Sequence, residues 1–83
     1  MYFVYILESL RDGSFYFGQT RDLNSRLARH NAGLEKYTSK KIPWKILWSC
    51  PVPTRGDAIR LERKLKNFKS RKRVLDFIQS NQG

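Results

Sequence analysis

The chain has 83 residues, and its 17 Lys and Arg outnumber its 7 Asp and Glu to give a formal net charge of +10. This length suits one compact domain, so we expect a single domain over residues 1–83. An apolar fraction of 40% is enough for a small core and excludes wholesale disorder. A surface this basic is typical of proteins whose partner is a polyanion, chiefly nucleic acid.

The cysteine count and the absence of long apolar segments indicate the cellular compartment. Cys50 is the only cysteine, so an internal disulfide is excluded and a reducing compartment is favoured. No apolar run approaches the roughly 20 residues of a membrane span, and residues 1–8 do not resemble a signal peptide. We therefore expect a cytoplasmic protein with no membrane association.

The N-terminal residues predict a β-hairpin. Residues 2–8 are aromatic and β-branched, as in a strand buried on both faces, and residues 15–18 resume this pattern. Asp12-Gly13 between them is a tight-turn signal, which makes the two strands antiparallel. Gly18 inside a strand pattern indicates a bulge, a bend or a close approach of another group to the backbone.

A helix and a loop are predicted next. Either Asp22 or Thr20 can cap a helix that runs to about Asn31, and Gly33 just beyond it is a stop signal. Residues 33–43 are polar and basic, which predicts a loop.

The rest of the chain predicts a third strand and two helices. The strand covers residues 44–52, where Pro51 and Pro53 are expected to close it. Helices are predicted over about 55–67 and over 71–80, after the capping residues Thr54 and Ser70. The order β-β-α-β-α-α defines an α/β (α+β) fold, with a small three-stranded, mainly antiparallel sheet flanked by three helices. This arrangement buries the apolar side chains of the helices, Leu23, Leu27, Leu61, Leu65 and Phe68.

Glu62 breaks the apolar pattern of the second predicted helix. It falls between Ile59 and Ala58 on the apolar arc, and it is the only acid among the eight cations of residues 60–73. It either neutralises a nearby cation (Arg63, Lys66 or Arg26) or serves as a hard oxygen ligand for Mg²⁺. Spacing alone leaves both interpretations open.

Arg26 and His30 lie four residues apart on the flank of the first predicted helix. Two cationic groups stacked on one helix face repel unless an anion lies between them. Arg presents a planar fork of donors that suits phosphate oxygens, and His can donate or shuttle a proton near neutral pH. The alternative is a solvated helix face, with His30 near the negative end of the helix dipole.

Two aromatic half-motifs carry a resemblance to a known family. Phe3-Val4-Tyr5 and Tyr16-Phe17-Gly18 resemble the half-motifs of the GIY-YIG nuclease superfamily. Further segments follow in the family's order: residues 19–31, Tyr37-Thr38 before Pro43-Trp44, and residues 58–66 around Glu62. The chain is similar to small stand-alone members such as the UPF0213 proteins, and to the N-terminal GIY-YIG domain found in an excinuclease.

The resemblance implies an active site made of Tyr5, Tyr16, Arg26, His30 and Glu62. Phe3 and Phe17 replace a Gly and an Ile of the motif, but both stand at packing positions. Asn67 follows Glu62 too closely to match the later Asn that some members carry.

The chemistry of phosphodiester cleavage suggests a role for each of these residues. Glu62 is expected to hold one divalent ion, Mg²⁺ or Mn²⁺, and Arg26 to stabilise charge on the phosphoryl oxygens. Tyr5 is the candidate general base, which requires that Arg26 and the metal lower its ordinary pKa of about 10. Tyr16 then orients the water or the phosphate, and His30 hydrogen-bonds a tyrosine or the phosphate. Exchanging the roles of the two tyrosines fits nearly as well.

The expected function is therefore a metal-dependent endonuclease that hydrolyses DNA with little sequence specificity, by nicking or by recognising structure. Phosphate contacts are expected from basic residues in the loop and the last two helices, Lys36, Lys40, Lys41, Arg63, Lys66, Lys69, Arg71 and Lys72. The competing interpretation is a non-catalytic, basic nucleic-acid-binding module with the same fold. The sequence leaves open whether RNA is also a substrate, and whether the protein acts as a homodimer or with a targeting partner protein. It also leaves open the pathway, of which DNA repair is one candidate.

Overall fold

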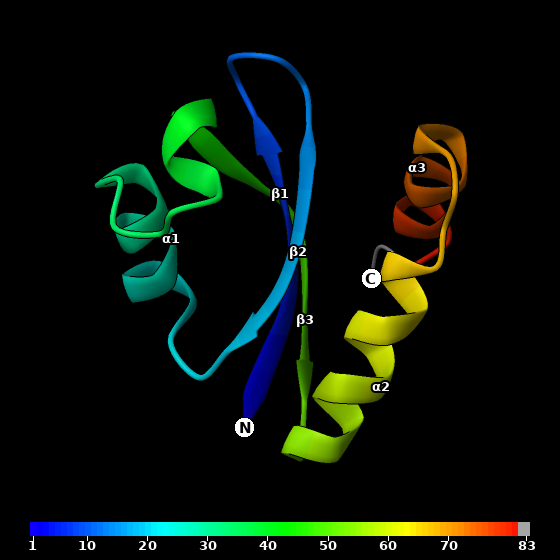
Figure 1. Ribbon diagram of the computed structural model, residues 1–83. Helices are drawn as coiled ribbons and strands as arrows, with labels where there is room; N and C mark the ends of the chain where they lie inside the picture. Colours follow the sequence, from blue (N-terminus) through cyan, green and yellow to red (C-terminus); the bar gives the residue numbers. More distant parts are fainter. Residues whose placement is uncertain (82–83) are drawn as a thin grey trace.

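The computed structural model describes residues 1–81, and residues 82–83 of the expected single domain lie outside the described residues (Figure 1). The elements follow the order β1 (Tyr2–Ser9), β2 (Phe15–Thr20), α1 (Leu23–Asn31), the 3₁₀ helix η1 (Thr38–Lys41), β3 (Trp44–Val52), α2 (Arg55–Lys66) and α3 (Arg71–Ser80). The predicted α+β class and the order β-β-α-β-α-α are confirmed. Among residues 1–81, no helix combines the length and apolar character that a membrane span needs.

The sheet is antiparallel throughout, with strand order β2-β1-β3. The central position of β1 explains its continuous apolar sequence, because successive side chains of a strand point to opposite faces. Val4 and Ile6 belong to the core on one face, whereas Tyr5 and Leu7 belong to the core on the other. The prediction that the first strand is buried on both faces is confirmed.

The two faces of the sheet are covered by different elements. Helices α2 and α3 cover the face of Val4 and Ile6, and α1 with η1 covers the face of Tyr5 and Leu7 (Figure 1). The first core is mainly aliphatic, and Ala58, Leu65, Val74 and Ile78 supply its helical part. Of the predicted helical core residues only Leu65 is fully buried, while the others are partly buried: Leu23, Leu27, Leu61 and Phe68.

Side-chain caps begin the three α-helices. Asp22, not Thr20, is the cap of α1: its carboxylate accepts a hydrogen bond from the Ser25 N–H at 3.0 Å. Thr20 supports the same turn, because its hydroxyl accepts from the Asp22 N–H at 3.1 Å. The caps of α2 and α3 are those predicted, Thr54 and Ser70.

Two local expectations are corrected. Pro51 does not close β3 but lies inside it, paired with Phe3, because β3 is an edge strand and tolerates a residue without an N–H. The segment 33–43 is not simply a polar loop, since it contains η1. Thr38 at the start of η1 is fully buried, and its carbonyl accepts from the Trp44 indole N–H at 2.9 Å.

Gly18 is required by the pairing of β1 with β2. It lies opposite Tyr5, whose ring crosses directly over the Gly18 backbone. A Cβ at position 18 would lie 2.5 Å from Tyr5 Oη and 2.6 Å from the adjoining ring carbon. Of the three expected explanations for this glycine, close approach of another group is the one observed.

We predict that Gly18→Ala destabilises the fold by about 1–3 kcal/mol, the usual cost of overpacking, because Tyr5 must leave its position. The matched control is Gly56→Ala, since a Cβ there meets nothing closer than an Arg60 side-chain nitrogen at 3.6 Å. Urea unfolding measures both variants. A Gly18→Ala protein as stable as Gly56→Ala would contradict the assigned position of Tyr5.

Candidate active site

Tyr5 and His30 form a buried polar pair between β1 and α1. Tyr5 Oη lies 3.1 Å from His30 Nε2, and each side chain is only 1% exposed. On its other side His30 Nδ1 lies 2.8 Å from Thr38 Oγ1. The interpretation of His30 as part of a solvated helix face is therefore wrong.

The hydrogen bonds of Thr38 indicate the direction of this chain. Its hydroxyl donates to the Glu35 carbonyl oxygen at 3.5 Å, which leaves the oxygen free to accept from His30 Nδ1–H. In that arrangement His30 Nε2 accepts a hydrogen bond from the Tyr5 hydroxyl. A neutral imidazole has one donor and one acceptor nitrogen, so it satisfies both neighbours.

Burial lowers the pKa of His30, because a buried imidazolium loses its hydration. The charge of Glu35 opposes this shift, whereas the charges of Arg26 and Arg29 add to it. His30 is therefore neutral at pH 7, as the hydrogen bonds require.

Tyr16 lies beside this pair within an aromatic group. Its ring centroid is 5.0 Å from that of His30, 6.5 Å from that of Tyr5 and 6.0 Å from that of the exposed Tyr37. Burial raises the pKa of Tyr16, and the charge of Glu35 adds to the rise. The two tyrosines expected in the site are thus neighbours on one face of the sheet.

The expected lowering of the Tyr5 pKa is not found in the protein alone. Burial, reinforced by Tyr16, raises the pKa of Tyr5 to about 12. The Arg26 guanidinium acts in the opposite direction, and the charge of Glu62 adds a smaller rise. Without further positive charge nearby, Tyr5 stays protonated throughout the physiological range.

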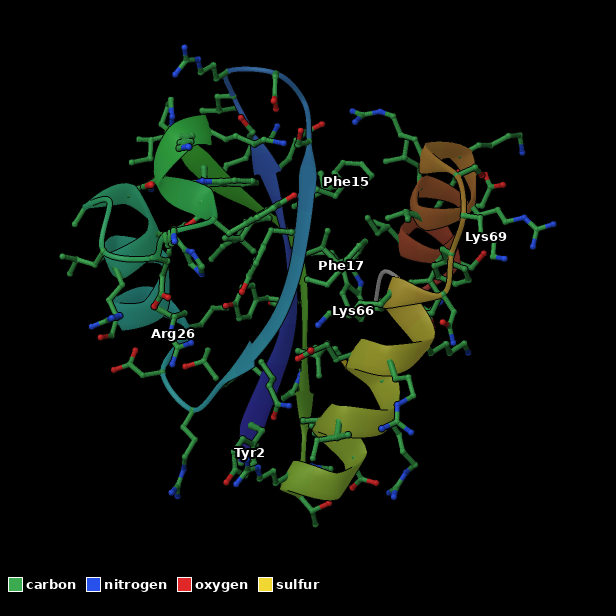
Figure 2. The ribbon with its side chains drawn as sticks, viewed as in Figure 1. Tyr2, Phe15, Phe17, Arg26, Lys66 and Lys69 are labelled. Carbon is green, nitrogen blue, oxygen red and sulfur yellow. The ribbon has the colours of Figure 1, made fainter. Side chains whose placement is uncertain are left out.

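Arg26 and Glu62 approach the tyrosines from opposite layers. Arg26 belongs to α1 and Glu62 to α2, yet the charges of both act on Tyr5 and on Tyr16. Figure 2 shows Lys66, the ion-pair partner of Glu62, directed from α2 toward β2, with Arg26 on the other side of that strand. The site therefore lies at the β2 edge of the sheet, where the two layers meet.

Glu62 forms an ion pair with one of the three cations expected near it. Its carboxylate Oε2 lies 2.7 Å from Lys66 Nζ, so Lys66 is its partner rather than Arg63 or Arg26. The Glu62 side chain is only 19% exposed, whereas that of Lys66 is 55% exposed. A half-buried carboxylate is thus held at the site by a cation that solvent can reach.

The donor set around Glu62 fits a single hydrated divalent ion. Among residues 1–81, no three His, Cys, Asp or Glu side chains gather into a metal cage. Glu62 would then supply a carboxylate ligand, with water completing the coordination. Mg²⁺ is usually bound in this way, through one or two carboxylates and several retained waters.

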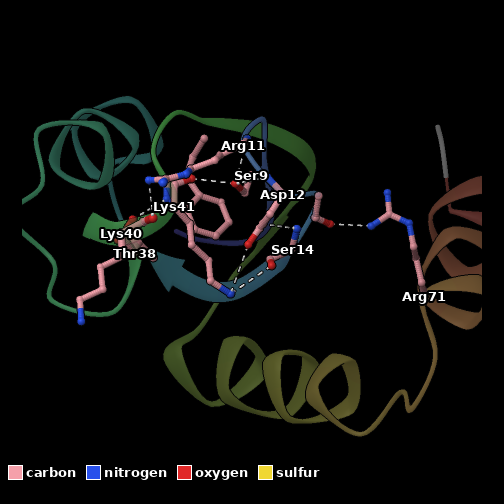
Figure 3. A network of polar contacts seen from close by, with 10 residues as sticks. Ser9, Arg11, Asp12, Ser14, Thr38, Lys40, Lys41 and Arg71 are labelled. Carbon is pink, nitrogen blue, oxygen red and sulfur yellow. Dashed lines mark hydrogen bonds and ion pairs between the residues drawn. The ribbon is translucent and has the colours of Figure 1, made fainter.

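Several of the predicted phosphate-binding cations have partners within the protein. Arg71 donates to the Gly13 carbonyl at 2.5 Å, pairs with Glu8 at 2.6 Å and stacks 4.5 Å from the Phe15 ring centroid. Its guanidinium thereby ties α3 to the β-hairpin (Figure 3). Lys41 donates to the Ser14 hydroxyl at 3.1 Å in the same network, which joins η1 to the hairpin (Figure 3).

The other predicted cations are distributed over three elements. Lys36, Lys40 and Lys41 surround Tyr37, beside the aromatic group of the site. Lys72 pairs with Asp76 at 2.8 Å on α3. Arg63 and Lys69 are exposed, on α2 and just beyond it.

Two features escaped the sequence analysis. The first is Thr38, the buried partner of His30, whose only signal was its place in the family pattern. The second is a groove lined by Arg21, Arg26, Arg29 and Arg55, of which only Arg26 was singled out. Arg55 lies far along the chain from the others, so no local pattern could have joined it to them.

Comparison with known proteins identifies the family. The family model described as the GIY-YIG catalytic domain matches residues 1–74. The chain therefore belongs to the GIY-YIG family, which is a nuclease family.

Within that family the chain is similar to UPF0213 proteins. It is 38% identical over 81 residues to the UPF0213 protein of Streptococcus pneumoniae serotype 4, a match covering 96% of this chain and 80% of that protein. It is 40% identical over 81 residues to the UPF0213 protein YsiG of Lactococcus lactis subsp. lactis, covering 96% and 77%. The solution NMR structure of the UPF0213 protein BH0048 from Bacillus halodurans matches with a TM-score of 0.62 at 33% identity, covering 100% of this chain and 88% of that one.

We predict that the buried, neutral His30 makes stability fall as the pH drops below its unfolded pKa of about 6.5. The pKa of His30 is lower in the folded state, so the unfolded state takes up the proton first as the pH falls. The free energy of unfolding therefore decreases, by no more than about 1.4 kcal/mol per pH unit for one proton. Urea unfolding between pH 7.5 and 5.5 measures the slope. His30 is the only histidine, so His30→Gln should remove most of this slope. An equal slope in both proteins would contradict the assignment.

Proposed function

We propose that the protein is a metal-dependent endonuclease that hydrolyses phosphodiester bonds of DNA with little sequence specificity, by nicking or at particular DNA structures. The observation that carries this proposal is the convergence at the β2 edge of Tyr5, Tyr16, Arg26 and His30 from one layer with Glu62 from the other. Membership of a nuclease family supports the reaction class. A phosphodiester is the substrate that this combination of acceptor, cation and carboxylate suits.

Glu62 is proposed to hold one Mg²⁺ or Mn²⁺ ion. When bound, such an ion neutralises phosphoryl oxygens and makes a coordinated water easier to deprotonate. Arg26 is proposed to stabilise the charge that develops on the phosphoryl oxygens, because its planar fork matches two oxygens of a phosphate.

The pair of Tyr5 and His30 supports Tyr5 as the general base. Its raised pKa means that a phenolate is scarcely populated. A relay avoids the phenolate: Tyr5 Oη takes a proton from the attacking water as its own proton passes to His30 Nε2. The neutral state of His30 is the one that can accept this proton. Tyr16, half-buried beside the pair, is proposed to orient the water or the phosphate.

Affinity for DNA is proposed to come from cations around this edge that contact backbone phosphates and carry no sequence information. The cations expected in this role remain Lys36, Lys40, Lys41, Arg63, Lys66, Lys69, Arg71 and Lys72. Four of these cations already have partners in the protein, so we expect the smallest contributions from them: Lys41, Lys66, Arg71 and Lys72. One chain supplies the whole candidate site, which favours cutting one strand per encounter without a homodimer.

We predict that the protein converts supercoiled plasmid to open circles with Mg²⁺ or Mn²⁺, and that Tyr5→Phe and Glu62→Gln lower the rate about 100-fold or more. Plasmid binding should persist in both variants. Matched controls are Tyr37→Phe, an exposed tyrosine, and Asp76→Asn, whose carboxylate pairs with Lys72 as Glu62 does with Lys66. Agarose electrophoresis over time, with and without EDTA, gives the rates.

Binding without cleavage of plasmid by the unmodified protein would leave two interpretations, the non-catalytic nucleic-acid-binding module and a nuclease that requires a branched or single-stranded substrate. Cleavage of a flap substrate under the same conditions separates them. Full Mg²⁺-dependent cleavage by Glu62→Gln would exclude Glu62 as the metal ligand. Equal cleavage by every variant would reveal a contaminating nuclease.

Lys66 gives a separate prediction, because its ammonium occupies the carboxylate that is proposed to hold the ion. Lys66→Met should lower the Mg²⁺ concentration for half-maximal cleavage about two- to fivefold, the range expected from losing an ion pair worth up to about 1 kcal/mol. The control is Lys72→Met, which removes the corresponding pair on α3. Titrating Mg²⁺ at saturating plasmid separates this effect from weaker DNA binding. The same half-maximal concentration in both variants would count against metal binding at Glu62.

A further inference from the structure

A groove beside the candidate active site is built from parts of the chain that are distant in sequence. It has a volume of about 550 Å³ and is lined by the start of β1, the end of β2, the turn into α1, α1 itself and the first residue of α2. Four arginines line this one cavity, Arg21, Arg26, Arg29 and Arg55.

The charge of the groove is strongly positive. Asp22 is the only acid in its lining, and the Asp22 carboxylate already accepts the Ser25 N–H as the helix cap. Arg29 pairs with Glu35 at 3.1 Å, but the Arg29 side chain remains 50% exposed and can still contact a ligand. Like charges gathered around one cavity favour an anion within it, and arginine forks suit phosphate oxygens.

The groove also has an aromatic wall. Tyr2 lines it, and the Arg21 guanidinium carbon lies 5.5 Å from the centroid of the Tyr2 ring. A phenol ring beside a guanidinium offers an aromatic surface to a nucleobase or a sugar. Proteins that bind single strands combine this kind of surface with a positive groove.

Arg26 joins the groove to the site. It lines the cavity, and it also acts on the pKa of Tyr5 and Tyr16. A strand that lies in the groove therefore leads directly to the tyrosines. The volume falls in the range of sites for drug-sized ligands, which suits one or two nucleotides of a single strand rather than a duplex.

We propose that this groove binds the single strand adjoining the bond to be cleaved, with Arg21, Arg29 and Arg55 on its phosphates and Tyr2 against a base or sugar. The proposal rests on the proposed nuclease function and deepens it. It assigns the protein a substrate in which one strand is unpaired next to the cleaved phosphodiester, such as a flap, a gap or an overhang.

The test is the affinity for a fluorescent 12-nucleotide oligothymidine, measured by anisotropy in EDTA over a range of KCl concentrations. The double variant Arg21→Gln/Arg55→Gln should weaken binding tenfold or more and reduce the slope of log K against log salt by about 1.4, about 0.7 for each lost phosphate contact. The matched control is Arg11→Gln/Arg73→Gln, two arginines outside the groove that remove the same charge. Tyr2→Leu should weaken binding about fivefold or more without changing the slope.

The same variants are then assayed for cleavage of a flap substrate under Mg²⁺. The groove variants should raise KM with kcat within about twofold, since they lie outside the reacting atoms, and equal urea midpoints verify their folding. Equal losses in the groove pair and the control pair would overturn the proposal. Cleavage of duplex DNA without affinity for the single strand would overturn the proposed role of the groove but not the proposed nuclease function. Single-strand binding that depends on the groove arginines, without cleavage of any substrate, would overturn the proposed nuclease function but not the proposed role of the groove in binding.

Discussion

The contact between Tyr5 and His30 over the backbone of Gly18 is the constraint on which the rest of the structure depends. It joins the central strand to α1, and through Thr38 it also fixes η1. An unpaired polar group in a protein interior costs far more than a satisfied one gains, so the chain of hydrogen bonds must be complete. Among the described residues no buried side-chain nitrogen or oxygen lacks a partner. A glycine in β2 is the condition for this arrangement, because any side chain there would displace the phenol.

One face of the sheet carries the larger apolar core, and the other carries most residues of the candidate site. Helices α2 and α3 close an apolar core in which aliphatic side chains pack with Trp48 and several partly buried phenylalanines. Burial of this apolar surface favours folding. On the other face, hydrogen bonds join Tyr5 to His30, His30 to Thr38, and the Trp44 indole to the Thr38 carbonyl. Glu62 belongs to a helix of the first layer but acts on the second, which places its charge at the boundary between them.

The cations of the chain have different roles in the structure. Arg71 and Lys41 join separate elements through pairs with acids and carbonyls, whereas Lys72 pairs with Asp76 within α3. The arginines of the groove face an open cavity, where their mutual repulsion favours an anionic ligand. Lys66 stands between these cases, because it neutralises Glu62 while most of its side chain stays in solvent. A net charge of +10 therefore says less about binding than the location of each cation does.

Local sequence determined the elements of this protein, since their signals lie within a few residues of one another. A continuous run of aromatic and β-branched residues marked β1, the Asp12-Gly13 turn fixed the hairpin, and side-chain caps marked the helices. The motif residues also followed from the sequence, because their types and order resemble a known family. The packing of those elements decided the rest. It buried His30, gave it Thr38 as a partner, raised the pKa of Tyr5 rather than lowering it, and brought Arg55 to Arg21. These depend on burial and on contacts between residues far apart in the chain, which only the folded arrangement of the layers can specify.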